Sequence, residues 1–387
     1  MIIPYSKVQL AGNEERYVKE VLKSGWLTTS SKALKFEKDF ASYVGAKYAC
    51  AVNSCTAALH LAVEAIGIKE GDKVLIPTMT FTASAEIVRY LGANPIFCDV
   101  EYNTSLISPQ ILQEALNKHK EIKAVIFVHF GGQAPSMYTN DGKGIVDICK
   151  NNNVFLIEDA AHAFPAKFEN QYVGSFGDVT CFSFYANKTI TTGEGGMLVT
   201  NNATIYERVK VMRLHGINRD VWNRFTTNDS KWEYDVIAPG YKYNLSDINA
   251  AIGLAQLEKA DYFREERQRC AQVYFNELNS LYAIELPQCN VPFEHHAWHL
   301  FPIKIKPEAR VDRNEFIDLM TENGIGTSVH YKPLHRMTYY KEVYGLENDD
   351  FPSAERIWKG TVSLPIYPNL SENEIKYVCK AIRKILN

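Results

Sequence analysis

The residues best suited to take part in a chemical reaction lie in one stretch, Val154 to Thr200. An apolar run ends there in two acids, Glu158 and Asp159, and a second apolar run leads to Lys188. A glycine cluster follows this lysine, and glycine permits close backbone approach and unusual dihedral angles. In a pyridoxal phosphate pocket, an acid keeps the pyridinium nitrogen protonated and a lysine forms the Schiff base. The stretch therefore predicts a pyridoxal phosphate site.

Each of these residues also has an ordinary structural interpretation. Asp159 is as well suited to capping a following helix as to pairing with a ring nitrogen. A lysine is usually solvated, but Lys188 follows an apolar strand, where desolvation lowers the pKa of an amine as a Schiff-base lysine requires. His162 lies three residues after Asp159, within reach of the same ring if a helix starts there, although an isolated histidine is more often structural. Ser183, five residues before the lysine, is placed to reach the cofactor phosphate.

A second candidate site is the segment 53–58, NSCTAA, which follows one predicted strand and opens a predicted helix. Free N–H groups and the helix dipole make such a position an anion site, and the hydroxyls of Ser54 and Thr56 can add donors. An ordinary helix N-cap is the simpler interpretation of this segment by itself. The anion site gains support because the carboxyl ends of strands in an open α/β sheet face a common crevice.

The elements that must position these residues alternate along the chain. Strands are expected at 48–52, 73–76, 95–98 and 124–128, with helices at 14–23, 33–43, 53–66, 82–91, 109–116 and 144–150. The stretch that carries the acids and the lysine supplies further strands. Apolar strands separated by helices favour an α/β fold with a mostly parallel sheet sandwiched by helices.

The pattern changes after residue 240. We expect one or two long helices over 246–281 and then strands at 298–305 and 327–331 around a helix at 312–323. A last helix starts at the capping box Ser371-x-x-Glu374 and carries an apolar face. Single cores rarely grow past ~250–300 residues, so a chain of 387 residues suits two domains. We place a large α/β domain with an N-terminal helical segment at 1–245 and a smaller C-terminal α+β domain at 246–387.

Composition excludes several classes of function. A net charge of −3 gives no reason to expect a nucleic-acid partner or an anionic membrane as the main target. Eight scattered cysteines without a CxxC pair favour reduced core thiols over a disulfide framework. The N-terminus lacks the apolar core of a signal peptide, and no run approaches ~18 apolar residues. These features predict a cytoplasmic protein without membrane insertion, and no metal site is predicted.

Taken together, the motifs resemble the DegT-type sugar aminotransferases, which are pyridoxal-phosphate enzymes of fold type I. The resemblance covers essentially the whole chain, and the ordered set of motifs is specific although each one is weak. The motifs are Ser24-Gly-Trp, Ser54-Cys-Thr-Ala-Ala-Leu, Pro77-x-x-Thr-Phe, Glu158-Asp-Ala-Ala-His, Phe182-Ser-Phe with Lys188, Gly193-Glu-Gly-Gly, Gly240-Tyr-Lys-Tyr-Asn, and Gly324-Ile-Gly-Thr with His330-Tyr331.

The resemblance implies a role for each matching residue. Its catalytic set is Lys188 as the covalent ligand, Asp159 at the pyridine nitrogen and His162 at the ring. The other implied cofactor contacts are Phe81 stacked on the ring and Thr56, Ala57 and Ser183 at the phosphate. The segment Lys242 to Asn244 matches one that reaches the neighbouring subunit's phosphate, which implies a homodimer with shared active sites. The implied sugar contacts are Trp26, His330 and Tyr331.

The nucleotide diphosphate of the substrate needs cationic or N–H partners. Arg219, Arg224 and Lys231, in the polar segment 217–236, are candidates for this role, although a plain solvated loop is an equal alternative.

Within the family, the segments 240–249 and 296–301 look most similar to C4 transaminases such as the one that makes UDP-4-amino-4-deoxy-arabinose. The similarity implies transfer of an amino group from L-glutamate to C4 of a UDP- or dTDP-linked 4-keto sugar, for surface-polysaccharide or glycan synthesis. Pyridoxamine phosphate is the implied intermediate form of the cofactor. The alternatives are C3 amination and a non-catalytic cofactor-binding regulator.

Three departures from the family pattern leave the exact sugar open. Cys55 replaces a small Gly or Ala, 131–144 is longer than usual, and Lys242 and Asn244 replace an Asn and an Arg. Related C3 dehydratases carry His in place of the Schiff-base lysine, and Lys188 argues against that activity.

Overall fold

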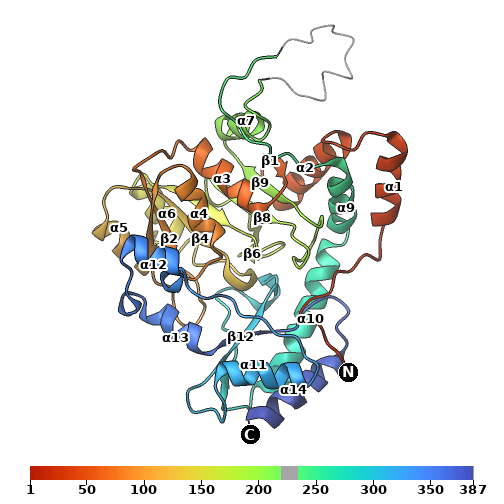
Figure 1. The fold of residues 1–387 in the computed structure, drawn as a ribbon, viewed down its shortest axis with the longest axis vertical. Helices are drawn as coiled ribbons and strands as arrows, with labels where there is room; N and C mark the ends of the chain where they lie inside the picture. The colour runs from red at the N-terminus through yellow and green to blue at the C-terminus, as the bar shows by residue number, and fades with distance from the viewer. Residues whose placement is uncertain (219–233, 387) are drawn as a thin grey trace.

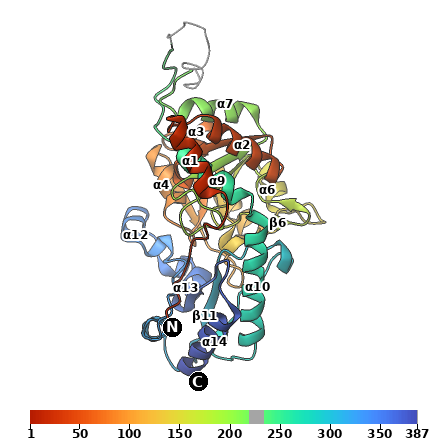
Figure 2. The same cartoon turned by 90° about the vertical axis from the view of Figure 1, so that its right-hand side faces the viewer.

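The computed structural model describes residues 1–218 and 234–386. Figures 1 and 2 show a large helix-covered sheet above a smaller C-terminal part, with the two ends of the chain near the small part. The candidate segment with Arg219, Arg224 and Lys231 lies outside the described residues.

A seven-stranded sheet forms the centre of the large part, in the order β1-β9-β8-β5-β4-β2-β3. Only β9 runs antiparallel to its two neighbours, and the remaining pairs are parallel. The predicted mostly parallel sheet is therefore confirmed. The strands are β1 (Tyr48–Val52), β2 (Lys73–Pro77), β3 (Asn94–Cys98), β4 (Ile122–Val128), β5 (Phe155–Asp159), β8 (Val179–Ser183) and β9 (Gly196–Thr200).

Helices cover both faces of this sheet because its strands are apolar on both sides. In β1, for example, Ala49 and Ala51 belong to one buried cluster while Cys50 and Val52 belong to the other. The first cluster includes α2 (Ser31–Val44), α5 (Pro109–Lys118), α6 (Ile145–Asn151) and α9 (Asp247–Leu257). The second includes α3 (Cys55–Ala65), α4 (Ala83–Tyr90) and α7 (Ala203–Met212). The helix α1 (Glu14–Ser24) packs against α9.

The smaller part is built on a three-stranded antiparallel sheet in the order β10-β11-β12. Figure 2 shows α10 running from the large sheet down to β11 and α14. The elements are α10 (Ala260–Leu278), β10 (Ile284–Glu285), β11 (Phe301–Ile305), α11 (Arg313–Glu322), α12 (Thr338–Tyr344), α13 (Pro352–Gly360), β12 (Thr361–Leu364) and α14 (Glu372–Leu386). A two-stranded hairpin, β6 (Lys167–Phe168) with β7 (Gln171–Tyr172), lies in the large part.

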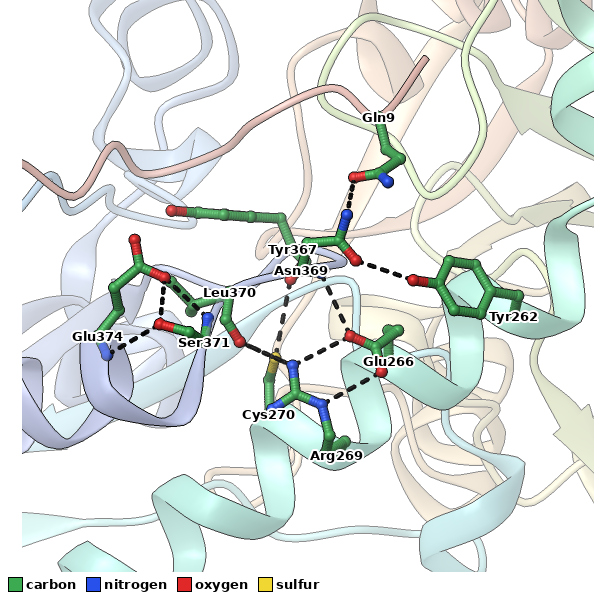
Figure 3. Close-up of polar contacts among 10 residues, drawn as sticks. All are labelled: Gln9, Tyr262, Glu266, Arg269, Cys270, Tyr367, Asn369, Leu370, Ser371 and Glu374. Carbon is green, nitrogen blue, oxygen red and sulfur yellow. Dashed lines mark hydrogen bonds and ion pairs between the residues drawn. The ribbon is translucent and has the colours of Figure 1, made fainter. Parts of the chain in front are cut away.

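Two expectations about local structure are settled here. The capping box of α14 is confirmed, since the Ser371 backbone N–H donates to Glu374 at 2.8 Å and the Glu374 N–H donates to Ser371 Oγ at 3.3 Å (Figure 3). The strand expected at 327–331 is wrong. Only Ser328 bridges to Ser363, because the chain then leaves the sheet and enters the cavity described below.

The domain boundary after residue 245 stays a prediction. The buried cluster of the large part includes α9 and the first residues of α10, Ala260 and Phe263, whereas Cys270 and Ala271 belong to the cluster of the small part. We propose that the boundary lies inside α10, because that is where the core contacts change from one cluster to the other.

No disulfide links the eight cysteines, which all lie among the described residues, and six of them are buried. None of the helices that residues 1–218 and 234–386 form has the length and apolarity that a membrane crossing requires.

Candidate active site

A cavity of about 400 Å³ opens at the carboxyl ends of β1, β2, β4, β5 and β8, and residues from the small part close it. Eight of the predicted site residues line it: Thr56, Phe81, Asp159, His162, Ser183, Lys188, His330 and Tyr331. The structure thus brings together residues that lie up to 275 positions apart (331 − 56 = 275). The crevice expected at the strand ends exists.

Lys188 lies in a tight loop between β8 and β9. The base of this loop is closed by hydrogen bonds from the Phe184 N–H to the Gly195 carbonyl (2.9 Å) and from the Thr192 N–H to the Phe184 carbonyl (3.0 Å). The pKa of the Lys188 amine is lowered to about 8, chiefly by burial; Cys55 and Asp159 oppose this effect, and the charge of Arg267 adds to it. A substantial neutral fraction near pH 7 to 8 is what a nucleophilic or basic amine requires.

Asp159 ends β5 and is held by two donors. The Ala161 N–H donates to its Oδ1 at 3.1 Å, and the Ser84 hydroxyl donates to its Oδ2 at 3.0 Å. Thr80 fixes that serine through a hydroxyl contact of 2.7 Å. Burial raises the pKa of Asp159, whereas these two donors and the Lys188 charge lower it. A buried carboxylate of this kind is stabilised by a cationic partner in the cavity, and a pyridinium nitrogen supplies one.

No helix follows Asp159 directly, so the helix-cap interpretation of this residue does not apply. A turn instead places the His162 ring 5.9 Å from the Tyr331 ring, with the two planes 22° apart. The Gly131 N–H donates to His162 Nδ1 at 3.4 Å, and Nε2 lies 2.8 Å from the Tyr331 hydroxyl oxygen. Burial, followed by the charge of Lys188, holds the pKa of His162 well below its usual value. The imidazole is therefore neutral, with its proton on Nε2 directed at Tyr331.

The N-terminus of α3 contributes another wall of the cavity. Ser54 Oγ accepts the Ala57 N–H at 3.0 Å, so the N-cap interpretation of this segment is confirmed. The N–H of Ala57 is consequently engaged within the helix, while Ser54, Thr56 and Ser183 line the cavity. A Cβ at Gly196 would lie 2.5 Å from the Ser54 carbonyl carbon, so glycine is required there for β9 to approach the helix start. Free N–H groups at this terminus suit a phosphate.

The small part contributes His330 and Tyr331. His330 Nδ1 lies 2.9 Å from the Ser363 hydroxyl, which anchors it to β12. Phe81 is 57% exposed and its ring lies 6.1 Å from that of Tyr331, so a large apolar surface faces the cavity mouth. An exposed aromatic of this size is suited to stacking on a planar ligand.

Three other predicted contacts, Trp26, Lys242 and Asn244, do not line this cavity. Lys242 Nζ donates to Asn244 Oδ1, and Asn244 Nδ2 donates to Thr29 Oγ1 at 2.6 Å. Their roles stay predictions.

Sequence reasoning missed several groups. Tyr185, Asn187 and Glu194 line the cavity from the Lys188 loop, and their proximity to that lysine in the chain was an available signal. Ser84, which supports Asp159, gave no such signal because it lies 75 residues away.

The chemistry of this donor set fits pyridoxal phosphate. A buried amine, a carboxylate supported by two donors, a helix N-terminus and an exposed aromatic ring surround one cavity. These are the groups that would hold the cofactor's carbonyl carbon, ring nitrogen, phosphate and ring face.

Comparison with known proteins points the same way. Residues 8–383 match the DegT/DnrJ/EryC1/StrS aminotransferase family. The spore coat polysaccharide biosynthesis protein SpsC of Bacillus subtilis is 42% identical over 99% of this chain and 97% of its own. GDP-perosamine synthase of Escherichia coli O157:H7 is 37% identical over 99% and 98%. Spr1654 of Streptococcus pneumoniae, solved in a PMP form, superposes with a TM-score of 0.88 at 28% identity, covering 100% of this chain and 98% of that one.

Spr1654 is also solved in a PLP form, with a TM-score of 0.88 at 27% identity and full coverage of both chains. The family match, the whole-length relatives and these neighbours agree with the cavity chemistry. The chain therefore belongs to the DegT/DnrJ/EryC1/StrS aminotransferase family, and it is a pyridoxal-phosphate-dependent sugar aminotransferase of fold type I.

Proposed function

We propose that this enzyme moves an amino group from L-glutamate to C4 of a nucleotide-linked 4-keto sugar, with UDP or dTDP as the carrier, for surface-polysaccharide or glycan synthesis. The observation that carries the reaction type is the single cavity shared by the Lys188 amine, the Asp159 carboxylate and the α3 terminus. The names of two relatives, a spore coat polysaccharide biosynthesis protein and GDP-perosamine synthase, support the class of pathway. The second name adds GDP to the carriers that deserve testing.

When bound, pyridoxal phosphate supplies an electron sink for the carbanion formed at the donor's α-carbon. The Lys188 amine would hold the cofactor covalently until the amino donor replaces it. It would then act as the base that accepts the proton from the donor's α-carbon. Its pKa of about 8 suits this exchange, because both protonation states are populated near neutral pH. Lys188 is therefore a covalent ligand first and a general base second.

Asp159 and His162 act by their placement. The Asp159 carboxylate supplies the negative charge that keeps the ring nitrogen protonated, and Ser84 and Ala161 hold it in one orientation. The neutral His162 contributes a flat ring and a fixed Nε2–H donor that is already engaged by Tyr331. In the second half of the reaction the same groups act in reverse, and the Lys188 ammonium returns a proton as the sugar amine forms.

The substrates carry more negative charge than the described part of the cavity neutralises. Lys188 is the sole lysine or arginine among its described lining residues. L-glutamate has two carboxylates, and a nucleotide sugar has a diphosphate, each of which needs cationic or N–H partners. Arg219, Arg224 and Lys231 are candidates within this chain, and a second subunit is the other source.

We therefore propose a homodimer with shared active sites, in which the segment Lys242 to Asn244 reaches the partner's cofactor phosphate. This assignment is supported by the location of that segment outside its own chain's cavity. The location that we propose is cytoplasmic, which the absence of a disulfide among the described cysteines supports.

The substrate assignment is tested by incubating the pure enzyme and L-glutamate with UDP-, dTDP- and GDP-linked 4-keto sugars and a matched 3-keto sugar. Mass spectrometry detects the amino sugar, and NMR locates the new amine. Conversion of a 4-keto sugar with the amine at C4 is the expected result. Conversion of the 3-keto sugar alone would contradict the proposal.

The nucleotide contact is tested by replacing Arg219 and Arg224 with Ala. The apparent KM for the nucleotide sugar should rise while that for L-glutamate stays constant. Equal changes in both constants would show that these arginines do not recognise the nucleotide.

A further inference from the structure

Arg267, in the middle of α10, is a buried arginine without an acidic partner. Only 3% of this residue is exposed. Among residues 1–218 and 234–386, no carboxylate lies within ion-pair distance of its guanidinium, whereas the comparably buried Arg213 pairs with Glu37. Removing a charge from water without a counter-charge costs several kcal/mol. The placement of this charge therefore calls for a specific explanation.

Backbone carbonyls take the place of the missing acid. Nη1 of Arg267 donates to the carbonyl oxygens of Trp298 and His299, each at 3.3 Å, and of Ile366 at 2.9 Å. The first two residues precede β11, and the third follows β12. One guanidinium thus joins α10 to one end of the small sheet, where the start of β11 pairs with the end of β12.

The carbonyls before β11 belong to the segment 297–300, which forms the wall behind His162. Two backbone hydrogen bonds, of 2.8 and 3.1 Å, join this segment to Gly131 and Gly132. The His299 ring lies 4.6 Å from the His162 ring. A Cβ at Gly132 would lie 3.0 Å from the His162 carbonyl oxygen and 3.1 Å from the His299 nitrogen. Because the backbones pack this closely, a shift of the segment 297–300 would also move His162.

The charge of Arg267 also influences two groups of the active site, the His299 ring and the Lys188 amine. Both ring nitrogens of His299 are buried without a partner, which suits a neutral ring. Burial, followed by the charge of Lys188 and, with a smaller effect, that of Arg267, holds the pKa of His299 well below its usual value. The same guanidinium adds to the effect of burial on the Lys188 amine.

We propose that Arg267 is a positioning residue of the active site, which fixes the segment 297–300 behind His162 and adds a permanent positive charge close to that segment. The contrasting possibility is that Arg267 stabilises the small part alone. The proposal concerns the site of the proposed function, but neither of its tests needs turnover. Failure of the transamination proposal and failure of this one are therefore distinguishable.

The test compares Arg267→Met, which removes the charge, with Arg267→Lys, which keeps the charge but loses the planar fork. The matched control is Arg269→Met. Arg269, two residues along α10, also ties the helix to the segment after β12, because it donates to the Leu370 carbonyl at 2.7 Å, and it pairs with Glu266 of its own helix at 3.0 Å (Figure 3). Its partners do not line the cavity.

The first readout is the pKa of Lys188 in the apo protein. Amines are labelled briefly with acetic anhydride across a pH series, and the Lys188 peptide is quantified by mass spectrometry. Arg267→Met should raise this pKa by roughly 0.5 unit, about a threefold loss of neutral amine at pH 7. Arg267→Lys and Arg269→Met should leave it unchanged. An identical pKa in both Met variants would overturn the electrostatic part of the proposal.

The second readout is the dissociation constant of pyridoxal phosphate from each apo protein. Both Arg267 variants should bind the cofactor roughly tenfold more weakly, because the segment behind His162 loses hydrogen bonds from a charged group. Arg269→Met should bind as the wild type does. If Arg267→Met does not fold, Arg267→Lys decides the question, since wild-type affinity in that variant would overturn the positioning role.

Discussion

Replacing Asp159 with Asn separates the charge of this residue from its structural hydrogen bonds. The amide retains an oxygen for the Ala161 N–H, which donates to Oδ1 at 3.1 Å, and its NH2 can donate to the Ser84 hydroxyl, which now lies 3.0 Å from Oδ2. Thr80 can accept the displaced hydroxyl proton, since its oxygen lies 2.7 Å away. The variant should therefore fold, with a small change in Tm.

The chemical cost should be large. At about 4 Å and an effective dielectric constant near 20, a carboxylate and a pyridinium attract by about 4 kcal/mol. Loss of this attraction leaves the ring nitrogen unprotonated and reduces the rate of the first half-reaction by about 10³-fold. The assay is stopped-flow decay of the cofactor's visible band after mixing with L-glutamate, which isolates this half-reaction from the sugar.

The matched control is Asp178→Asn. Asp178 lies outside the cavity and accepts the Leu156 N–H at 2.8 Å, so it supports the same strand without facing the cofactor. This control should keep a rate near that of the wild type. A folded Asp159→Asn variant that reacts within about tenfold of the wild type would refute the charge-pairing argument.

Three further predictions follow from the same contacts. Tyr331→Phe removes the hydroxyl oxygen that lies 2.8 Å from His162 Nε2, which leaves the Nε2–H without its acceptor at a cost of about 1–3 kcal/mol. The affinity for the cofactor, measured by equilibrium titration, should fall, and an unchanged affinity would contradict the contact. Phe36 is fully buried, and its ring lies 5.2 Å from the Phe184 ring. Phe36→Ala should therefore lower the free energy of unfolding, measured by chemical denaturation, by about 3–5 kcal/mol. A decrease below about 1 kcal/mol would contradict the packing. The pKa of Lys188 is about 8 in the folded chain and 10.5 for an ordinary lysine, so the unfolded chain binds more protons between these pH values. The free energy of unfolding of the apo wild type should therefore rise from pH 8 to pH 10 relative to that of Lys188→Met. A difference between the two proteins that does not change with pH would contradict the lowered pKa.

The sequence was sufficient to predict the sheet and the meeting of its strand ends. Apolar runs separated by helical periods predicted a mostly parallel sheet, and its carboxyl ends bring Thr56, Asp159 and Lys188 to one cavity. Local chain order carries this information, because Asp159 ends a strand, Thr56 lies at the start of a helix and Lys188 follows a strand by five residues.

Contacts between distant elements could not be predicted in the same way. Ser84 supports Asp159 from another helix, and Arg267 reaches carbonyls about 30 and 100 residues away. A strand was expected at 327–331, but only Ser328 forms a bridge, and His330 and Tyr331 line the cavity instead. The phosphate contact of Ala57 stays a prediction, and the structure adds that its N–H donates to Ser54 Oγ.

The central claim is that the Lys188 amine holds the cofactor covalently and acts as the base in amino transfer. The most direct measurement is the visible absorption of the purified, cofactor-loaded protein before and after addition of L-glutamate, in the wild type and in Lys188→Ala. The wild type should show a visible band that L-glutamate bleaches with release of 2-oxoglutarate, and Lys188→Ala should lack the band. A wild-type band that L-glutamate leaves intact, or a band that survives in Lys188→Ala, would contradict the account.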